Sequence, residues 1–328
     1  MPLAIDIAFV VAGIAVLLVG GDFLVRGAVA LANKAGIPPL LVGLTIVAFG
    51  TSAPEMVVGA AAAISNAPGL AVGNIVGSNI ANIFLVLGLP AMLMPMATSA
   101  PGIRRNAVIA LGAALLLVAL TWDRSLSLSD GLVLGAGIIA YILYLAINAG
   151  RAQGDPVIAE LTEAATGEHL PHSNARILLL VLAGIVFLPV GANLIVEGAS
   201  DIAALMGVSE AVIGLTVIAF GTSLPELATA AVAALKRHSE VAIGNVIGSN
   251  IFNVFAVGGI TGISAGLIRG GAPIEPEFFQ LDYWVMIAAS VIALALIVRR
   301  KPISRLTGAV LFAGYIGYIA ALAYVNLA

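Results

Sequence analysis

The sequence contains no cysteine, and only 9% of its 328 residues are charged, whereas 61% are hydrophobic. Without cysteine, the chain can form neither a disulfide nor a thiol-based catalytic site, and it cannot ligate zinc or an iron–sulfur cluster through sulfur. A soluble protein of this length needs far more polar sequence to cover its surface. The scarcity of charge therefore indicates a protein whose main solvent is lipid.

Histidine is scarce as well, because the sequence has only His169, His172 and His238, and all of them fall in predicted loops. Serine and zinc hydrolases use histidine as base or ligand, and no histidine lies in an apolar segment here. The zinc motif His-Glu-x-x-His is also absent. We therefore expect no enzymatic activity, and neither a cofactor nor a nucleic-acid partner.

Long apolar runs dominate the chain. The first, from Ile5 to about Leu31, follows Met-Pro-Leu-Ala without a basic residue, so it is too long and wrongly flanked for a cleaved signal peptide. Crossing a bilayer takes about 17 to 25 apolar residues. We predict an all-α polytopic membrane protein with ten transmembrane helices, at about 3–33, 39–64, 70–97, 106–122, 129–149, 177–206, 210–235, 241–268, 282–298 and 303–327.

Basic residues are distributed unevenly over the loops, and they accumulate on the cytoplasmic side of membrane proteins. One alternate set of loops holds 12 of the 14 Lys and Arg residues, and the other set holds only Arg124 and Arg269. This pattern predicts that both termini lie outside and that residues 151–176 form a cytoplasmic linker. Acidic and histidine residues of this linker could form a regulatory cation site, but a solvated linker is the simpler interpretation; they are Asp155, Glu160, Glu163, Glu168, His169 and His172.

The sequence is also duplicated. The segment Gly43–Glu55 returns as Gly214–Glu226, and an offset of 171 (226 minus 55) aligns the two halves without a gap from Gly20 to Gly88. Each half holds five predicted spans, and an odd number makes the second copy enter the membrane in the opposite orientation. We therefore predict a first five-helix repeat at 1–150 and a second, inverted repeat at 177–328.

The repeated segment concentrates oxygen ligands in apolar sequence. Thr51, Ser52 and Glu55 fall within one helical turn, and Pro54 leaves the carbonyl of Gly50 without its helical partner. The second copy offers the same groups on Thr222, Ser223 and Glu226. An ionisable residue at membrane depth marks an ion path by default. Oxygen ligands with formal charge suit hard cations such as Ca2+ and Na+, so we predict a cation site between Pro-broken second and seventh helices.

The span after each Pro-Glu pair carries a polar stripe. Asn74, Ser78 and Asn82 are spaced by four residues, and the second copy repeats them as Asn245, Ser249 and Asn253. Residues at this spacing share one face of a helix. They could hydrogen-bond neighbouring helices or bind the cation, and both interpretations stay open at this point.

These paired segments, Gly-Leu-Thr-x-x-Ala-Phe-Gly-Thr-Ser-x-Pro-Glu and Gly-Asn-x-x-Gly-Ser-Asn-Ile, resemble the two α-repeats of the sodium/calcium exchanger family within the calcium/cation antiporter superfamily, particularly its prokaryotic, potassium-dependent-like members. The resemblance covers roughly residues 20–95 and 191–266. It implies ten helices, a central group of cation sites, and alternating access in which the first and sixth helices slide. It also implies transport of Ca2+ and Na+ across a prokaryotic plasma (inner) membrane.

By position, the family's ion ligands fall on the backbone of Ala48 and Ala219 and on ten side chains. These are Thr51, Ser52, Glu55, Ser78, Asn82, Thr222, Ser223, Glu226, Ser249 and Asn253. Family members often carry an aspartate where this chain has Asn253, so the predicted site has two carboxylates rather than three.

Two carboxylates balance one Ca2+, two Na+ or two protons. Charge alone therefore leaves open a Ca2+/H+ antiporter, and the K+ dependence stays open as well. A passive cation channel would use the same ligand chemistry, but an inverted repeat around one midplane site favours an antiporter. The sequence does not determine the oligomeric state.

Overall fold

The computed structural model describes residues 3–36, 39–64, 68–151, 173–205 and 219–327. Nearly all of these residues are helical. In the described part of the chain, the extended segments are the antiparallel strands β1 (Ser125–Leu126) and β2 (Ala272–Pro273) and one isolated bridge between Met96 and Ile303. Helices satisfy their backbone hydrogen bonds internally, which suits an apolar chain in lipid.

Eight helices within the described ranges are long and apolar enough to cross a membrane, and each coincides with a span predicted from the sequence. They are formed by α1 (Leu3–Ala35), α5 with η2 and α6 (Pro68–Ala81, Asn82–Val86 and Gly88–Leu93), α7 (Ile103–Leu120), α8 (Leu128–Arg151), α10 (Asn174–Leu205), α14 with η5 and α15 (Ser239–Phe252, Asn253–Val257 and Gly258–Arg269), η6 with α16 (Phe278–Asp282 and Tyr283–Val298), and α17 (Arg305–Leu327).

The other two predicted spans differ from these. Residues 39–64 form α2 (Pro39–Val42), η1 (Gly43–Val47), α3 (Ala48–Thr51) and α4 (Ala53–Ile64), and the helix bends by 48° between Thr51 and Ala53. Of residues 210–235, the structure describes α12 (Ala219–Thr222) and α13 (Leu224–Leu235). The predicted span 70–97 is too long, because the chain becomes extended at Met94 and Met96 then pairs with Ile303.

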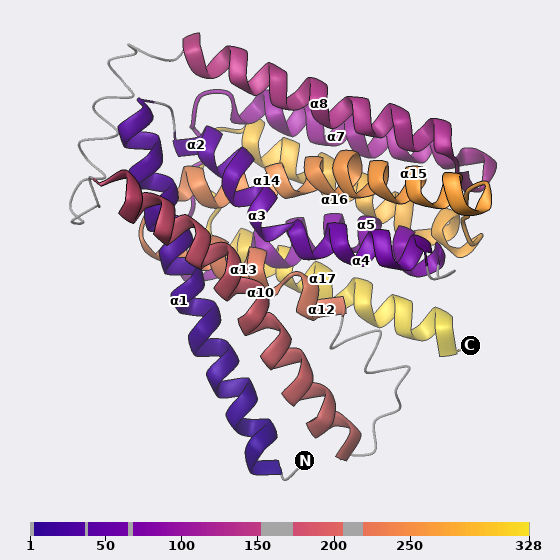
Figure 1. Ribbon diagram of the computed structural model, residues 1–328, viewed down its shortest axis with the longest axis horizontal. Helices are drawn as coiled ribbons and strands as arrows, with labels where there is room; N and C mark the ends of the chain where they lie inside the picture. The colour runs from indigo at the N-terminus through magenta and orange to yellow at the C-terminus, as the bar shows by residue number, and fades with distance from the viewer. Residues whose placement is uncertain (1–2, 37–38, 65–67, 152–172, 206–218, 328) are drawn as a thin grey trace.

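Helices α1 and α10 lie side by side and project from the rest of the molecule, with the N-terminus at the free end of α1 (Figure 1). Their contact depends on glycine. A Cβ on Gly13 of α1 would lie 2.8 Å from the carbonyl oxygen of Gly191, and a Cβ on Gly184 of α10 would lie 2.9 Å from that of Gly20. Small residues let apolar helices approach closely in lipid, so these glycines favour the pairing of α1 with α10.

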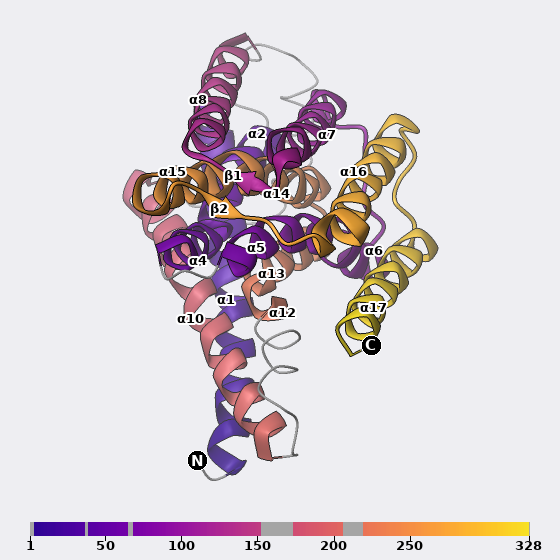
Figure 2. The same cartoon turned by 90° about the vertical axis from the view of Figure 1, so that its right-hand side faces the viewer.

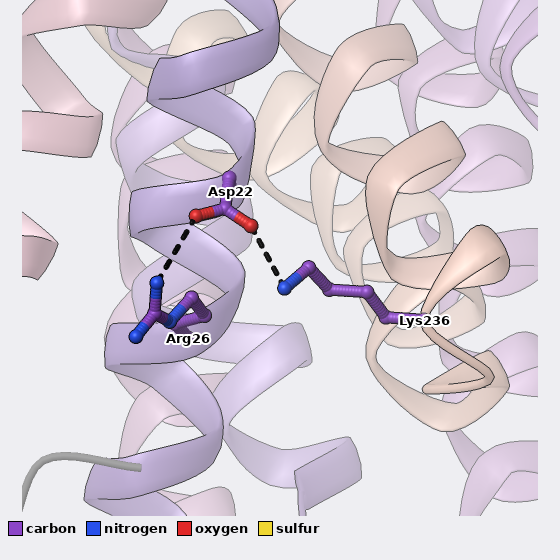
Figure 3. A network of polar contacts seen from close by, with 3 residues as sticks. All are labelled: Asp22, Arg26 and Lys236. Atoms are coloured by element: carbon purple, nitrogen blue, oxygen red, sulfur yellow. Dashed lines mark ion pairs between the residues drawn. The ribbon is translucent and has the colours of Figure 1, made fainter. Parts of the chain in front are cut away.

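An ion-pair network joins α1 to the end of α13. Figure 3 shows Asp22 between two cations, with its carboxylate 2.8 Å from Nζ of Lys236 and 3.6 Å from Nη1 of Arg26. The side chains of Asp22 and Lys236 are 31% and 19% exposed, so the pair is only partly buried. Asp22 therefore stabilises the contact of α1 with the end of α13.

Two short backbone pairings join loops that are far apart in the sequence. Strand β1 follows Arg124 and pairs with β2, which follows Arg269, and the amide of Ile274 donates to the carbonyl of Arg124 at 2.9 Å. Met96 and Ile303 exchange two backbone hydrogen bonds of 3.1 and 2.8 Å, which joins two loops of the basic-rich set. Each pairing thus connects loops that the sequence places on the same side.

Helix α14 lies in the middle of the molecule (Figure 2). All of its residues except Glu240 are buried, and it packs against η1, α3, α13 and α7. A helix that is buried all round has no lipid-facing stripe, so its polar residues face protein. The polar stripe of the second copy, including Asn245 and Ser249, is therefore enclosed by other helices.

Candidate cation site

The break after α3 presents three oxygen-bearing side chains inside the protein. Thr51 and Ser52 are 0% exposed and Glu55, in the first turn of α4, is 1% exposed. The backbone leaves the helical conformation at Ser52, where φ is −84° and ψ is 3°. Pro54 has no N–H to donate to the carbonyl of Gly50, so the hydrogen-bond ladder is interrupted here. The break therefore brings a carboxylate and two hydroxyls together in a buried place.

The second copy has almost the same local geometry. Ser223 precedes α13 with φ −86° and ψ 0°, and Pro225 follows in the first turn of that helix. Ser223 and Glu226 are each 1% exposed, whereas Thr222 at the end of α12 is half-buried. Matching dihedrals at Ser52 and Ser223 indicate that the shared Ser-x-Pro-Glu sequence sets this backbone shape.

The polar stripes of α5 and α14 contribute four further predicted ligands, all of them buried. Ser78 is 6% exposed, Asn82 1%, Ser249 0% and Asn253 1%. A five-residue π-helical turn begins at Asn82 and another at Asn253. Such turns widen a helix, redirect its side chains, and are frequent at functional sites. Equivalent turns at equivalent asparagines place this distortion beside both Pro-Glu segments.

Direct contacts connect the two copies. The Oγ hydroxyl of Ser52 donates to Oε1 of Glu226 at 3.1 Å, although these residues are 174 positions apart. Thr51 Oγ1 lies 3.5 Å from Ser249 Oγ. The carboxylates of Glu55 and Glu226 are also close enough to interact electrostatically. Five predicted ligands from both halves therefore form one cluster, namely Thr51, Ser52, Glu55, Glu226 and Ser249.

Several oxygens of the predicted ligands have no hydrogen-bond partner among the described residues. They include Oε2 of Glu55, Oε2 of Glu226, Oγ of Ser223 and Oδ1 of Asn253, and all four are buried. Buried polar atoms are normally hydrogen-bonded. Carboxylate, hydroxyl and amide oxygens are the ligands that Ca2+ and Na+ take. The free oxygens of these predicted ligands thus fit a hard cation.

The other donor types fit this interpretation. Among the described residues, no metal site is built from three or more His, Cys, Asp or Glu side chains. Zinc and copper sites depend on nitrogen and sulfur ligands, whereas Ca2+ and Na+ accept neutral hydroxyl and amide oxygens. The cluster is therefore suited to alkali and alkaline-earth cations.

Two predicted backbone ligands have different surroundings. The carbonyl oxygen of Ala48 accepts from the amide of Ser52 at 3.0 Å and lies 3.3 Å from Thr51 Oγ1, so it takes part in the last turn of α3. Ala219 begins α12, directly after residues 206–218, which lie outside the described part of the chain. The acidic and histidine side chains of the linker, Asp155 to His172, also lie outside them.

The first asparagine of each polar stripe, Asn74 or Asn245, is not among the predicted ligands, and each binds the backbone of a glutamate. Asn74 Nδ2 donates to the carbonyl oxygen of Glu55 at 3.0 Å, and Asn245 Nδ2 donates to that of Glu226 at 3.4 Å. The same bond thus recurs at an offset of 171 in both copies. The sequence signal that could have identified this role is that both asparagines recur at the same offset in the two copies.

Comparisons with known proteins identify the family of the chain. A family model described as sodium/calcium exchanger protein matches residues 5–150 and 176–324. The inner membrane protein YrbG of Escherichia coli is 35% identical over 325 residues, which cover 97% of this chain and 97% of YrbG. Sodium/calcium exchanger MaX1 of Methanosarcina acetivorans is 32% identical, with 98% of this chain and 100% of MaX1 covered.

A solved structure has the same fold over nearly the whole chain. The sodium-calcium exchanger NCX_Mj, soaked with 10 mM Na+ and no Ca2+, aligns with a TM-score of 0.79 at 29% identity and covers 98% of this chain and 99% of its own. The chain therefore belongs to the sodium/calcium exchanger family, and it is an integral membrane protein that transports inorganic cations rather than an enzyme.

Proposed function

We propose that the protein is a secondary active antiporter that exchanges Ca2+ for Na+ at a site built around Glu55 and Glu226. The observation that carries the proposal is the contact between the copies, in which Ser52 donates to Glu226 at 3.1 Å while one oxygen of each glutamate keeps no partner among the described residues. Two carboxylates neutralise one Ca2+ or two Na+, so the same ligands can hold either ion in turn. The names of MaX1 and NCX_Mj as sodium/calcium exchangers support this pairing of ions.

We further propose that the chain has ten spans arranged as two inverted repeats, with helices broken before Pro54 and Pro225. The breaks at Ser52 and Ser223, the π-helical turns at Asn82 and Asn253, and the paired asparagine bonds all recur at the same offset. Inverted repeats around a midplane site allow one ion to be reached from either side in turn. Alternating access is thus the mechanism that this arrangement favours.

The protein is proposed to lie in a prokaryotic inner membrane with both termini outside. The name of YrbG supports the location, and the uneven loop charges support the orientation. Because the chain has no cysteine, Ala165→Cys would introduce a single thiol into the linker. An impermeant thiol reagent should label it only after the cells are permeabilised, and labelling in intact cells would overturn the orientation.

Uptake of Ca2+ into proteoliposomes tests the coupling ion. We expect an outward Na+ gradient at equal pH to drive Ca2+ uptake, and the same assay with and without K+ measures whether K+ is needed. Uptake driven only by a pH gradient would identify protons as the coupling ion, which the two-carboxylate site also permits by charge. Downhill Ca2+ flux without any counter-ion would instead indicate a channel. In every case Glu275→Gln, which changes an exposed glutamate in a loop, is the matched control.

A further inference from the structure

We infer that Asn245 is a positioning residue of the cation site, which turns the hydroxyl of Thr51 so that its oxygen faces the ion. This inference rests on the proposed function, because it assumes that Thr51 binds the cation. It adds a residue outside the predicted ligand set, with a specific task.

Asn245 uses both ends of its amide. Its Oδ1 accepts from Thr51 Oγ1 at 3.1 Å, and its Nδ2 donates to the carbonyl oxygen of Glu226 at 3.4 Å. The side chain is 0% exposed and lies in the fully packed part of α14. One residue therefore connects a hydroxyl of the first copy to the backbone of the glutamate of the second copy.

The direction of the Thr51 proton decides whether this hydroxyl can bind a cation. A hydroxyl has one proton and two lone pairs, and only a lone pair can coordinate a cation. Thr51 Oγ1 has several acceptors in reach, and the nearest is Asn245 Oδ1 at 3.1 Å, followed by the carbonyl of Ala48 at 3.3 Å and Ser249 Oγ at 3.5 Å. Donation to Asn245 points the proton at α14 and leaves the lone pairs for an ion.

The bond from Asn245 to Glu226 fixes the other end of the amide. An asparagine could otherwise rotate and present its NH2 group to Thr51, which would then have to accept and would lose a lone pair. Because Nδ2 is engaged by the carbonyl oxygen of Glu226, Oδ1 is the atom that remains for Thr51. Groups behind a metal ligand commonly set its orientation in this way, and their loss typically weakens metal affinity about 10- to 100-fold.

Equilibrium binding of Ca2+ to the purified full chain tests the inference independently of the coupling ion. We expect Asn245→Leu, which has similar volume but no polar end, to weaken Ca2+ binding at least about tenfold. If Asn245→Leu does not purify as a folded protein, Asn245→Ala takes its place.

A double-mutant cycle separates positioning from general damage to the fold. If Asn245 acts through Thr51, then Asn245→Leu should weaken binding much less in a Thr51→Val background, because the hydroxyl that it orients is gone. Asn250→Leu is the matched control. It lies in the same helix, is 2% exposed, and donates through Nδ2 to the carbonyl of Asn79 at 3.3 Å.

The control variant should lower the melting temperature but leave the Ca2+ affinity within about twofold, since Asn79 is not one of the predicted ligands. Equal losses of affinity in Asn245→Leu and Asn250→Leu, or additive losses in the cycle, would overturn the positioning role. A parent protein that binds no Ca2+ would overturn the proposed function itself, which is a distinct result.

Discussion

The two copies of the repeated segment have nearly the same residues but different contacts. In the first copy Thr51 is fully buried, and Ala48 packs closely on α14, with its Cβ 2.7 Å from the position that a Cβ on Gly248 would take. In the second copy Thr222 is half-buried. Both positions hold threonine, so the difference in exposure comes from the surroundings of each copy.

The serines show the same contrast. Ser52 donates to Glu226, whereas the hydroxyl of Ser223 has no partner among the described residues. A duplicated motif therefore supplies equivalent ligands without making the two halves of the site identical. In an antiporter that faces one side at a time, unequal packing of equivalent segments is what one conformation of the cycle should show.

The largest expected effect comes from the glutamate that each copy contributes to the proposed site. Glu55→Gln and Glu226→Gln should each abolish Ca2+ exchange, because one remaining carboxylate cannot neutralise a divalent ion in a buried site. Neither change should unfold the protein, because each removes a buried charge that had to be accommodated without an opposite charge. The measurements are uptake into proteoliposomes and melting temperature in detergent. A folded variant that exchanges Ca2+ at the parental rate would exclude the shared site.

An intermediate effect concerns the packing of one copy on the other. In Gly248→Ala the new Cβ would lie 2.7 Å from Ala48 Cβ and 2.9 Å from the carbonyl oxygen of Leu44. Overpacking of this kind costs about 1 to 3 kcal/mol. In Gly112→Ala, at an exposed position of α7 where the new Cβ meets no neighbouring atom within 4 Å among the described residues, alanine favours the helix by about 1 kcal/mol. We expect Gly248→Ala but not Gly112→Ala to lower the melting temperature, and equal decreases would show that α14 does not pack closely on α3.

The smallest expected effect is a gradual dependence on pH. Carboxylates bind a metal ion only when ionised, so protons compete with Ca2+. Glu55 and Glu226 interact, and they should titrate as a pair rather than as separate residues. Apparent Ca2+ affinity should therefore weaken as the pH falls from about 8 to about 6, and Glu55→Gln should flatten the curve of any residual binding. Affinity that stays constant over this range would argue against carboxylate ligation.

Much of the fold was accessible from the sequence because lipid imposes long apolar helices. Eight predicted spans are confirmed as apolar helices long enough to cross a membrane, and Ser52 of one copy contacts Glu226 of the other in the buried interior. The duplication made this possible, since each ligand appears twice at one offset. The ion ligation itself stays a prediction.

Other features depended on packing between distant segments. The bridge from Met96 to Ile303 ends a helix early, although Met94 and Met96 read as a continuation of the apolar run. The π-helical turns at Asn82 and Asn253 have no compositional signal, and the choice of Asn245 as acceptor for Thr51 depends on how α3 meets α14. Such contacts join residues far apart in sequence, so local pattern does not predict them.

The central claim is that Glu55 and Glu226 share one cation. Binding of radioactive Ca2+ to the purified chain measures this directly. The account predicts a single saturable Ca2+ ion per chain, displaced by Na+ and lost when either glutamate becomes glutamine. Two independent Ca2+ ions per chain, with each substitution removing only one of them, would contradict the shared site.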